Sequence, residues 1–523
     1  MTGEWQGQLR RRAFFAKEAL QRRFVRPKPS FDFKEMSTAY LNRISDPRFT
    51  WPVTQRQEKK NTLIVVTPWL FTAVPYFSME LGRALAAEGA QVRYLWEPTD
   101  ILFNAGKPRE TIRIKEVLDR LGEDAEVVEL SSQAREVSDE YLPALQELVY
   151  ENAVRQAGGE SDAEKHLGDQ EQKVSALRKH LVQILSVFEK NRPDLLIIPG
   201  GVFGVSGLYV LACRIAGIPF TTFDSGADRL IFTHDTVAAH MEDLAVAFKQ
   251  IYPLLDSKKT EKFQTHATDR IAVRRAGKDV FRLQPSSSES SKGEQYDIFI
   301  PLNFRTDTAA LLRQKLFHNV REWLAALLKW VASQPKVSIV IRQHPCERIP
   351  EYRGKDDWEE FLAPFRKTLG SRLRFVSAWD HINTYDLLAK AKVVLPYTSR
   401  VGVEAAFLGV PVILGTRCYY ENLGFSTSPE TRTEYFSTVR QALDGQLPVE
   451  DEARRRAAFL YYLAEECCLC PTVFNPTPED FMHWVKLEPS KLMSDAKIPL
   501  LLDCLLNREV MPKLLFQESN SVA

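Results

Sequence analysis

The chain has little of the material that marks secreted, membrane-spanning or nucleic-acid-binding proteins. Seven cysteines in 523 residues are too few for a disulfide scaffold. No run of about 20 apolar residues is present, so no segment is expected to span a bilayer. With 69 basic and 68 acidic side chains, the formal net charge is +1, which leaves no overall field to hold nucleic acid. We therefore expect a cytoplasmic protein that does not bind nucleic acid.

The N-terminus also lacks a secretory signal, because arginines interrupt its apolar residues. The clustered Cys467, Cys468 and Cys470 have neither a second pair nor a nearby histidine of the kind that completes a zinc site. We interpret the cysteines as buried or idle thiols in a reducing compartment.

A strongly basic segment, Leu9–Lys28, lies near the start of the chain. Eight basic residues against one acid give it a local charge of +7. Its apolar residues recur at helical spacing. This pattern is typical of a helix lying on an anionic membrane, here the inner face of the plasma membrane. The alternative is a helix docked on its own protein with a solvated basic face.

Strands and helices alternate in two regions of the chain, which predicts an α/β fold with parallel sheets. In the first region, strands are expected at 62–67, 91–96, 194–199 and 220–223. In the second region, strands are expected at 297–301, 337–342, 373–376, 393–396 and 412–414. The loop Trp69–Tyr76 follows the first strand, at the edge where open α/β sheets bind ligands.

A serine-rich stretch, Pro285–Gln295, has the composition of a linker and separates the two regions. A polar stretch, Gly158–Gln170, is expected to be an exposed loop. The architecture expected is two Rossmann-like domains facing a cleft, where ligands bind. The predicted parts are a basic helical extension (1–55), an α/β domain with a helical insertion (56–284), the linker (285–295), a second α/β domain (296–470) and a helical C-terminal segment (471–523).

Residues that suit anion binding follow the strand ends of the second domain. The strand that ends at Arg342 delivers Gln343-His344-Pro345, and the proline ends the strand and fixes the turn. An imidazole there can donate a hydrogen bond to a phosphate or carboxylate, or carry positive charge to it. The alternative is a histidine that bonds a loop carbonyl.

A second group of residues follows the strand at 393–396. Thr398 and Ser399 precede a helix, whose free N–H groups and dipole favour an anion. They can instead be plain N-caps. Glu404, near the first turn of the helix, either favours the dipole or accepts hydrogen bonds from ribose hydroxyls.

A third group follows one strand later and includes Gly415, Tyr419, Tyr420 and Gly424. The loop 416–429 is polar and aromatic without an apolar period, so we expect it to line the cleft. The three groups together place an imidazole, a helix start, a carboxylate and an aromatic loop at one sheet edge. That combination suits a nucleotide monophosphate or diphosphate bound without a metal.

The order of these motifs resembles bacterial capsule polysaccharide biosynthesis proteins, the cytoplasmic β-Kdo transferases that build the lipid-linked anchor of exported capsules. The resemblance covers Ile298–Tyr435. Glu-Ala and Gly-x-Pro-Val are shared by many GT-B glycosyltransferases and by sugar-nucleotide 2-epimerases, whereas His-Pro and the tyrosine loop are more specific. The matching residues are His344-Pro345, Ser399, Gly402, Glu404-Ala405, Gly409, Pro411-Val412, Gly415, Tyr419-Tyr420 and Gly424.

In the first domain the resemblance is thinner. Asp224-Ser225-Gly226, Arg229 and Thr233-His234-Asp235 resemble a family stretch that pairs an acid-glycine turn with an arginine and a downstream acid. Here the spacing is one residue short, and Asp235 stands where the family tends to have glutamate. Asn303 and Asp307 stand where the family has a polar, acid-containing loop that follows the first strand of the nucleotide domain.

The resemblance implies a GT-B glycosyltransferase of surface polysaccharide assembly. It would transfer a Kdo-like acidic sugar from a nucleotide-activated donor, such as a CMP sugar, to a glycan or lipid-linked acceptor. Asp224 or Asp235 would act as base or nucleophile on the sugar side, unless each only stabilises a turn. His344 would also be catalytic by easing departure of the nucleotide. Asn303, Asp307 and Arg229 would contact the acceptor or the donor. The residues expected to hold the donor are His344, Pro345, Thr398, Ser399, Gly402, Glu404, Tyr419 and Tyr420.

The sequence has no strand-end Asp-x-Asp pair of the kind that metal-dependent GT-A enzymes use, so we expect no metal and no cofactor. Two other functions remain open. A sugar-nucleotide 2-epimerase or hydrolase shares the Glu-Ala and Gly-x-Pro-Val motifs. A catalytically inactive GT-B-like scaffold at the membrane would use the basic segment Leu9–Lys28 without turning over any donor.

Overall fold

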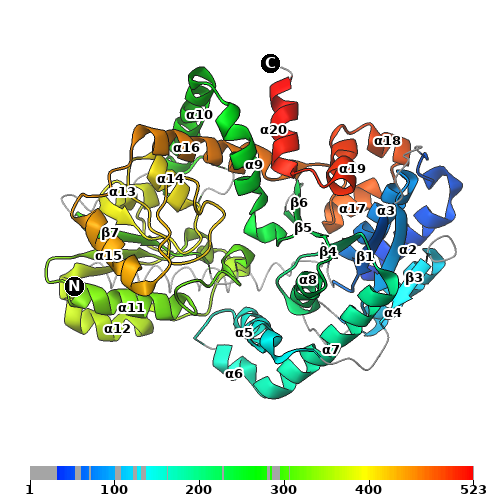
Figure 1. Cartoon of the computed structure of the whole chain (residues 1–523), viewed down its shortest axis with the longest axis horizontal. Helices are drawn as coiled ribbons and strands as arrows, with labels where there is room; N and C mark the ends of the chain where they lie inside the picture. The colour runs from blue at the N-terminus through cyan, green and yellow to red at the C-terminus, as the bar shows by residue number, and fades with distance from the viewer. Residues whose placement is uncertain are drawn as a thin grey trace, which may run out of the picture. The chain divides into compact units, whose positions relative to one another are not determined.

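The computed structural model shows two compact α/β units (Figure 1). The predicted basic helix Leu9–Lys28 and nearly all of the predicted linker lie outside the residues that the structure describes. The described residues are 32–53, 60–69, 72–99, 108–121, 126–130, 137–161, 163–226, 229–279, 283–285, 295–304 and 307–521.

The first unit, called here the seven-stranded unit, comprises residues 32–152, Leu167–Asp243 and 465–521. Its sheet has the order β11-β6-β5-β4-β1-β2-β3. The five strands from β5 to β3 are parallel, whereas β6 and β11 run antiparallel to their neighbours. The strands are β1 (Asn61–Val66), β2 (Gln91–Trp96), β3 (Glu126–Glu129), β4 (Leu195–Pro199), β5 (Phe220–Gly226), β6 (Arg229–His234) and β11 (Cys470–Pro471).

Helices from both ends of the chain complete the seven-stranded unit. The central strand β4 is buried along its whole length, as expected for a parallel strand covered on both faces. The principal helices are α2 (Phe33–Ser45), α3 (Val74–Ala87), α4 (Pro108–Leu121), α5 (Leu142–Ala157), α7 (Gln170–Asn191), α8 (Gly204–Ala216), α17 (Pro478–Trp484), α18 (Pro489–Met493), α19 (Lys497–Asn507) and α20 (Met511–Ser521).

The second unit, called here the four-stranded unit, comprises Ala153–His166 and Leu244–Ala464. Its sheet is parallel throughout, in the order β10-β7-β8-β9, and Val412 extends it through an isolated bridge to Val394. The strands are β7 (Tyr296–Pro301), β8 (Ile339–Arg342), β9 (Leu373–Val376) and β10 (Ala391–Val394).

One face of this sheet carries a continuous apolar core. Alternate residues of β7 and β8, including Ile298 and Ile341, pack against Trp323 and Leu327 of α11 and Tyr435 of α15. In Figure 1, α11 and α12 lie together on that side of the sheet. The helices of the unit are α6 (Ala163–Leu167), α9 (Asp243–Ile251), α10 (Ser257–Arg275), α11 (Val320–Ala332), α12 (Trp358–Leu369), α13 (Thr384–Leu388), α14 (Val401–Phe407), α15 (Arg432–Leu443) and α16 (Asp451–Tyr462).

The α/β class with two Rossmann-like units is confirmed, but the chain divides differently from the prediction. The helices α9 and α10 belong to the four-stranded unit, since Phe263 of α10 packs on Phe459 of α16 with ring centroids 4.9 Å apart. The predicted boundary at 285–295 therefore falls too late. The chain also returns to the seven-stranded unit after Ala464, where a separate C-terminal segment was predicted.

The stretch expected to be an exposed loop, Gly158–Gln170, is partly buried instead. Glu160 is only 8 % exposed, and its carboxylate accepts hydrogen bonds from the N–H groups of Val320 and Arg321 at 3.2 and 3.0 Å. These are the first two residues of α11, where a carboxylate is favoured by the helix dipole. Glu160 thus docks on a helix start, whereas Lys165, His166 and Asp169 later in the stretch are exposed, as predicted.

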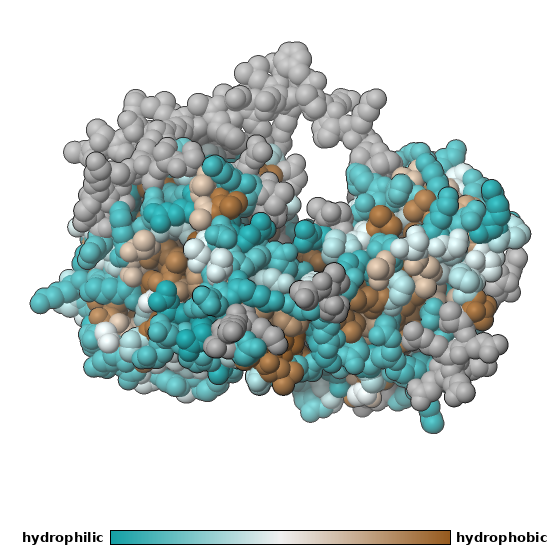
Figure 2. All heavy atoms as spheres, turned by 90° about the horizontal axis from the view of Figure 1, so that it is seen from above, coloured by the Kyte–Doolittle hydropathy of each residue, from teal (hydrophilic) through white to brown (hydrophobic). Residues whose placement is uncertain are grey.

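All seven cysteines are buried and free of disulfide bonds, as predicted. None of the helices in the described ranges has the length and hydropathy to cross a bilayer. On the face drawn in Figure 2, hydrophilic residues cover most of the described surface, with apolar residues interspersed.

A buried ion cluster explains why both ends of the chain join the seven-stranded unit. Glu80 of α3 is fully buried, and its carboxylate accepts hydrogen bonds from Arg43 and Arg83 and from the Trp51 indole. Arg43 lies on α2 and also donates to three carbonyls that follow α17, that of Leu487 at 2.6 Å. One arginine thus ties α2, α3 and the C-terminal region together.

We predict that Glu80→Gln lowers the free energy of unfolding by about 3–5 kcal/mol, because it leaves the buried Arg43 without its counter-charge. Urea unfolding measures this change. Burial raises the pKa of Glu80, but the charges of Arg43 and Arg83 outweigh it and lower the pKa overall. The contribution of Glu80 is therefore present at neutral pH and is lost as the pH falls through its lowered pKa.

The control for this experiment is Glu35→Gln on α2, where the side chain is exposed. We expect it to change the free energy of unfolding by less than about 0.5 kcal/mol. Equal effects of the two substitutions would contradict the role assigned to the cluster.

Candidate functional site

The residues predicted from the second domain converge at one edge of the four-stranded sheet. β7 lies between β10 and β8, and all three strands run in the same direction. Their carboxyl ends therefore bring together Asn303 after β7, His344 after β8 and Thr398 after β10. This is the edge at which open α/β sheets bind ligands.

Asn303 connects two of these loops. It is 8 % exposed, and its Oδ1 accepts a hydrogen bond from the N–H of Thr398 at 3.2 Å. Its Nδ2 donates to Asp307 Oδ2 at 3.0 Å, and Asp307 Oδ1 accepts from the N–H of Ala309. The predicted polar loop after β7 therefore fixes the position of the loop after β10.

His344 follows β8 and caps the 3-10 turn Pro345–Arg348, of which the buried Pro345 is the first residue. Its Nδ1 lies 3.2 Å from the N–H of Cys346 and 2.7 Å from the thiol of the same residue. Its ring meets Phe304 edge to face, with centroids 5.6 Å apart. The structure thus shows Nδ1 facing donors, not the loop carbonyl that was considered as an alternative.

The imidazole of His344 is neutral at pH 7. Burial, and secondarily the nearby charge of Arg342, lower its pKa to about 4. Of the two possibilities raised by the sequence, the structure favours a neutral hydrogen-bond donor over a positive charge. The fixed positive charge lies on Arg342 instead, which donates from Nη2 to the Ile382 carbonyl at 3.2 Å.

The start of α14 differs from the prediction. The N–H of Val401 donates to Ser399 Oγ at 3.3 Å, and the N–H of Gly402 donates to the Ser399 carbonyl at 3.0 Å. The next N–H, that of Val403, is bonded to the Arg400 carbonyl. These N–H groups therefore already have partners within the protein. Arg400 is the N-cap residue of α14, and Ser399 precedes it.

Thr398 has an unused polar atom at this edge. It is 7 % exposed, and its Oγ1 is buried without a hydrogen-bond partner among the described residues. A buried hydroxyl left unpaired costs about 1–3 kcal/mol, so it is rarely retained without a use. This hydroxyl was one of several polar groups in the sequence, and only the structure distinguishes it.

The two tyrosines of the loop 416–429 are buried and support the residues of the site. From the sequence we expected the side chains of this loop to line a cleft. Tyr420 is fully buried, and its hydroxyl donates to the Ser399 carbonyl at 2.8 Å. Tyr419 is 4 % exposed and packs edge-on against Tyr420. Residue 402 must be glycine, because a Cβ there would lie 2.4 Å from the Tyr420 hydroxyl.

Glu404 is buried on α14 and forms an ion pair with Arg274 of α10, at 3.3 Å between Oε1 and Nη1. This pair helps to explain why α10 belongs to the four-stranded unit. Contact of Glu404 with a ribose stays a prediction.

Asp224 lies in a separate cavity of about 220 Å³ in the seven-stranded unit. The cavity includes Trp69 and Thr72 from the loop after β1, as predicted for that loop. Burial raises the pKa of Asp224 to about 6, against a smaller opposing effect of the hydrogen bond from the Ser225 N–H. An acid with this pKa can act as a general base near neutral pH.

Asp235 does not lie beside Asp224, and the prediction that one of the two is the catalytic base or nucleophile stays a prediction. Strands β5 and β6 form an antiparallel hairpin in which Asp224 pairs with Ile231. Asp235 lies at the other end, where its carboxylate accepts from the Phe220 N–H and pairs with Arg508. The apolar run 230–232 was the sequence signal for β6, a strand that was not predicted from the sequence.

Arg229 lies at the same end of the hairpin as Asp224, since it pairs in register with Gly226. Its position is thus compatible with the predicted role beside the acid. The role itself stays a prediction.

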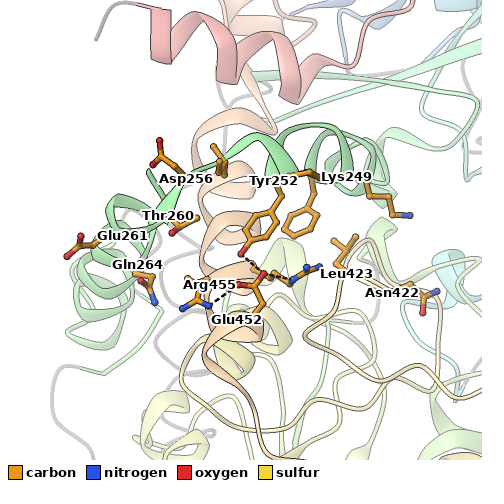
Figure 3. Close-up of a pocket in the computed structure, with 14 residues that line it drawn as sticks. Lys249, Tyr252, Asp256, Thr260, Glu261, Gln264, Asn422, Leu423, Glu452 and Arg455 are labelled. Carbon is orange, nitrogen blue, oxygen red and sulfur yellow. Dashed lines mark hydrogen bonds and ion pairs between the residues drawn. The ribbon is translucent and has the colours of Figure 1, made fainter. Parts of the chain in front are cut away.

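A wider cavity of about 870 Å³ lies in the four-stranded unit and contains none of the predicted site residues (Figure 3). Glu452 of α16 accepts hydrogen bonds there from the Tyr252 hydroxyl and from Arg455 and Arg456. Glu452 is thus paired with both arginines, and the three side chains together carry one net positive charge. The cavity is open to solvent beside Asn422 of the tyrosine loop.

Among the described residues, no group of three or more histidine, cysteine or acidic side chains is placed to hold a metal ion. Independence from a metal and from a cofactor stays a prediction.

The fold is that of an α/β protein with two Rossmann-like units. The candidate site lies at the carboxyl edge of the four-stranded sheet. Residues 238–447 match the family model described as capsule polysaccharide biosynthesis protein. This part of the chain is therefore a capsule polysaccharide biosynthesis domain, and the resemblance seen in the motifs is confirmed. The match includes Asn303, His344 and Thr398, and it excludes Asp224, Arg229 and Asp235.

Solved structures with similarity to the chain include two transferase domains of KpsC from Thermosulfurimonas dismutans. The β-Kdo 2,7 transferase is 17 % identical, with 51 % of this chain and 80 % of that chain covered and a TM-score of 0.29. The β-Kdo 2,4 transferase is 14 % identical, with 58 % and 93 % covered and a TM-score of 0.34. MnaA of S. aureus with UDP is 12 % identical, with 76 % and 91 % covered and a TM-score of 0.25. No curated protein matches the chain, and the assignment rests on the family match.

We predict that Gly402→Ala lowers the free energy of unfolding by about 1–3 kcal/mol, because the new methyl group displaces Tyr420 from the Ser399 carbonyl. Urea unfolding of the purified protein measures the change. Gly415→Ala serves as the control in the same unit, since its methyl group would meet ring atoms at 3.3–3.4 Å only. If Gly402→Ala proved as mild as Gly415→Ala, the contact would not shape the loop as described.

Proposed function

We propose that the protein is a glycosyltransferase of capsule polysaccharide biosynthesis that takes a sugar from a nucleotide-activated donor. The acceptor would be a glycan or a lipid-linked glycan. The family match of residues 238–447 supports the pathway, and the ligand edge of the four-stranded sheet supports a phosphate-containing donor. Contact of Leu9–Lys28 with an anionic membrane belongs to the same proposal and rests on sequence alone.

The observation that supports binding of the nucleotide sugar at this sheet edge is the buried Thr398 hydroxyl, which has no hydrogen-bond partner among the described residues. The neutral imidazole of His344 lies at the same edge. In the proposal, this hydroxyl and the imidazole N–H of His344 donate to phosphate oxygens of the nucleotide. Such hydrogen bonds strengthen as negative charge develops on the departing nucleotide. Asn303, Ser399 and Tyr420 keep these groups in place through the contacts described above.

Asp224 is the proposed base on the sugar side. Its carboxylate lies in the cavity of the seven-stranded unit, and its raised pKa suits removal of a proton from an acceptor hydroxyl. In that step the acceptor oxygen forms the new bond to the anomeric carbon, the bond to the nucleotide phosphate breaks, and Asp224 takes the proton.

We predict that at least one of CMP, UDP, GDP and CDP raises the Tm of the protein, because a ligand that binds the native state stabilises it by mass action. His344→Ala should reduce the shift, whereas His381→Ala, which removes an exposed histidine of the same unit, should not. Differential scanning fluorimetry gives the measurement. Absence of a shift with all four nucleotides would contradict the donor site.

Thr398→Val tests separately whether the unpaired Thr398 hydroxyl binds the nucleotide. We expect it to raise the Tm of the free protein, since it removes a buried hydroxyl without a partner, and to reduce the stabilisation by the nucleotide. A lower Tm of the free protein, together with an unchanged response to the nucleotide, would show that the hydroxyl serves the fold alone.

We predict that transferase activity rises with pH through about 6, because Asp224 must be ionised to accept a proton. Asp224→Asn should lower kcat by about 10²–10⁴-fold and remove this limb of the pH profile. Asp235→Asn, at the far end of the hairpin, should leave the limb in place. Turnover of the nucleotide sugar without any acceptor would instead indicate a 2-epimerase or a hydrolase.

A further inference from the structure

Cys346 lies at the carboxyl edge of the four-stranded sheet, where the nucleotide sugar is proposed to bind. Neither the motifs nor the proposed function gives this residue a role. It is the second residue of the 3-10 turn that His344 caps, and it is 5 % exposed. Both of its hydrogen-bond donors face the same atom. The backbone N–H lies 3.2 Å from His344 Nδ1, and Sγ lies 2.7 Å from it.

These contacts determine which nitrogen of the imidazole carries the proton. A neutral imidazole has one N–H group and one nitrogen with a free lone pair. The Nδ1 atom faces an N–H group, which can only donate, so Nδ1 must present its lone pair. The proton of the neutral ring therefore lies on Nε2.

The thiol of Cys346 also favours the proton of the imidazole on Nε2. Burial raises the pKa of this thiol, so it keeps its hydrogen at neutral pH. Burial also lowers the pKa of His344 to about 4, so the imidazole does not take that proton. The pair is therefore a neutral S–H donor and a neutral acceptor nitrogen, not a thiolate and an imidazolium.

We propose that Cys346 is a positioning residue that holds His344 in the Nε2–H tautomer, so that the ring presents a neutral N–H donor to a phosphate group of the sugar donor. No proton is transferred in this arrangement, and no bond of the protein forms or breaks. The assignment of the tautomer stands on the contacts of Nδ1 alone, whereas the phosphate as its partner rests on the proposed function.

The thiol adds two things that the backbone N–H cannot supply alone. It is a second donor to Nδ1, and it fills the space from which water would otherwise reach that atom. A ring without the thiol can accept a proton from water at Nδ1 or turn about its χ2 angle. Its pKa then moves toward that of a solvated histidine, which is about 6.5.

The tautomer can be read directly by nuclear magnetic resonance of the full-length protein with ¹⁵N-labelled histidine. The signals of His344 are identified by their loss in His344→Gln. We expect the wild-type ring to show the Nε2–H form from pH 5.5 to 8. In Cys346→Ala, which keeps the backbone N–H, the Nε2–H form should persist but the midpoint of titration should rise, whereas Cys346→Ser, which keeps a side-chain donor, should resemble the wild type.

Activity supplies the second readout. Cys346→Ala should lower kcat/KM for the nucleotide sugar by about fivefold, the size of effect expected for one hydrogen bond, and Cys346→Ser should restore most of it. Cys213→Ala is the control, because it removes a fully buried thiol from α8 of the seven-stranded unit. It should change neither the spectrum of His344 nor kcat/KM.

An Nδ1–H form in the wild type would overturn the proposal, and so would an unchanged midpoint of titration in Cys346→Ala. Failure of the proposed function would look different. The spectra would then follow the expectation, while neither the wild type nor Cys346→Ser would turn over any nucleotide sugar.

Discussion

The hydrogen bond from the Tyr420 hydroxyl to the Ser399 carbonyl is the contact on which the shape of the candidate site depends. It is possible only because residue 402 lacks a side chain. The bond holds the loop after β10, and the N–H of Thr398 in that loop reaches Asn303 after β7. The Thr398 hydroxyl is thereby left at the sheet edge without a partner in the described protein.

The site is notable for the neutrality of the groups that would meet a phosphate. The imidazole of His344 is uncharged, the first N–H groups of α14 are used internally, and Glu404 is paired with Arg274. Burial lowers the pKa of Arg342 to about 10, so its side chain remains charged at pH 7. Phosphate recognition would thus rely on oriented donors, with the positive charge of Arg342 near the imidazole. Oriented dipoles need little rearrangement as charge develops, which suits a leaving nucleotide.

Much of the scaffold could be predicted because it follows from local patterns. The strands at 91–96 and 373–376 have the predicted bounds, and the convergence of His344 and Thr398 follows from the parallel order of strands. What the sequence could not show depends on distant contacts. The pairing of β5 with β6, which separates Asp235 from Asp224, was not apparent, and the return of the C-terminal helices depends on Arg43 reaching the carbonyls after Trp484. The use of the α14 N–H groups by Ser399 and Arg400, and the burial of Tyr420, are likewise tertiary facts.

A crystal structure of the full chain with CMP or another nucleotide that binds tests the central claim most directly. The account predicts phosphate density at the carboxyl edge of β7, β8 and β10, within hydrogen-bond distance of Thr398 Oγ1 and His344 Nε2. Density instead in the cavity beside Glu452 and Arg455, with the sheet edge occupied by water alone, would contradict it.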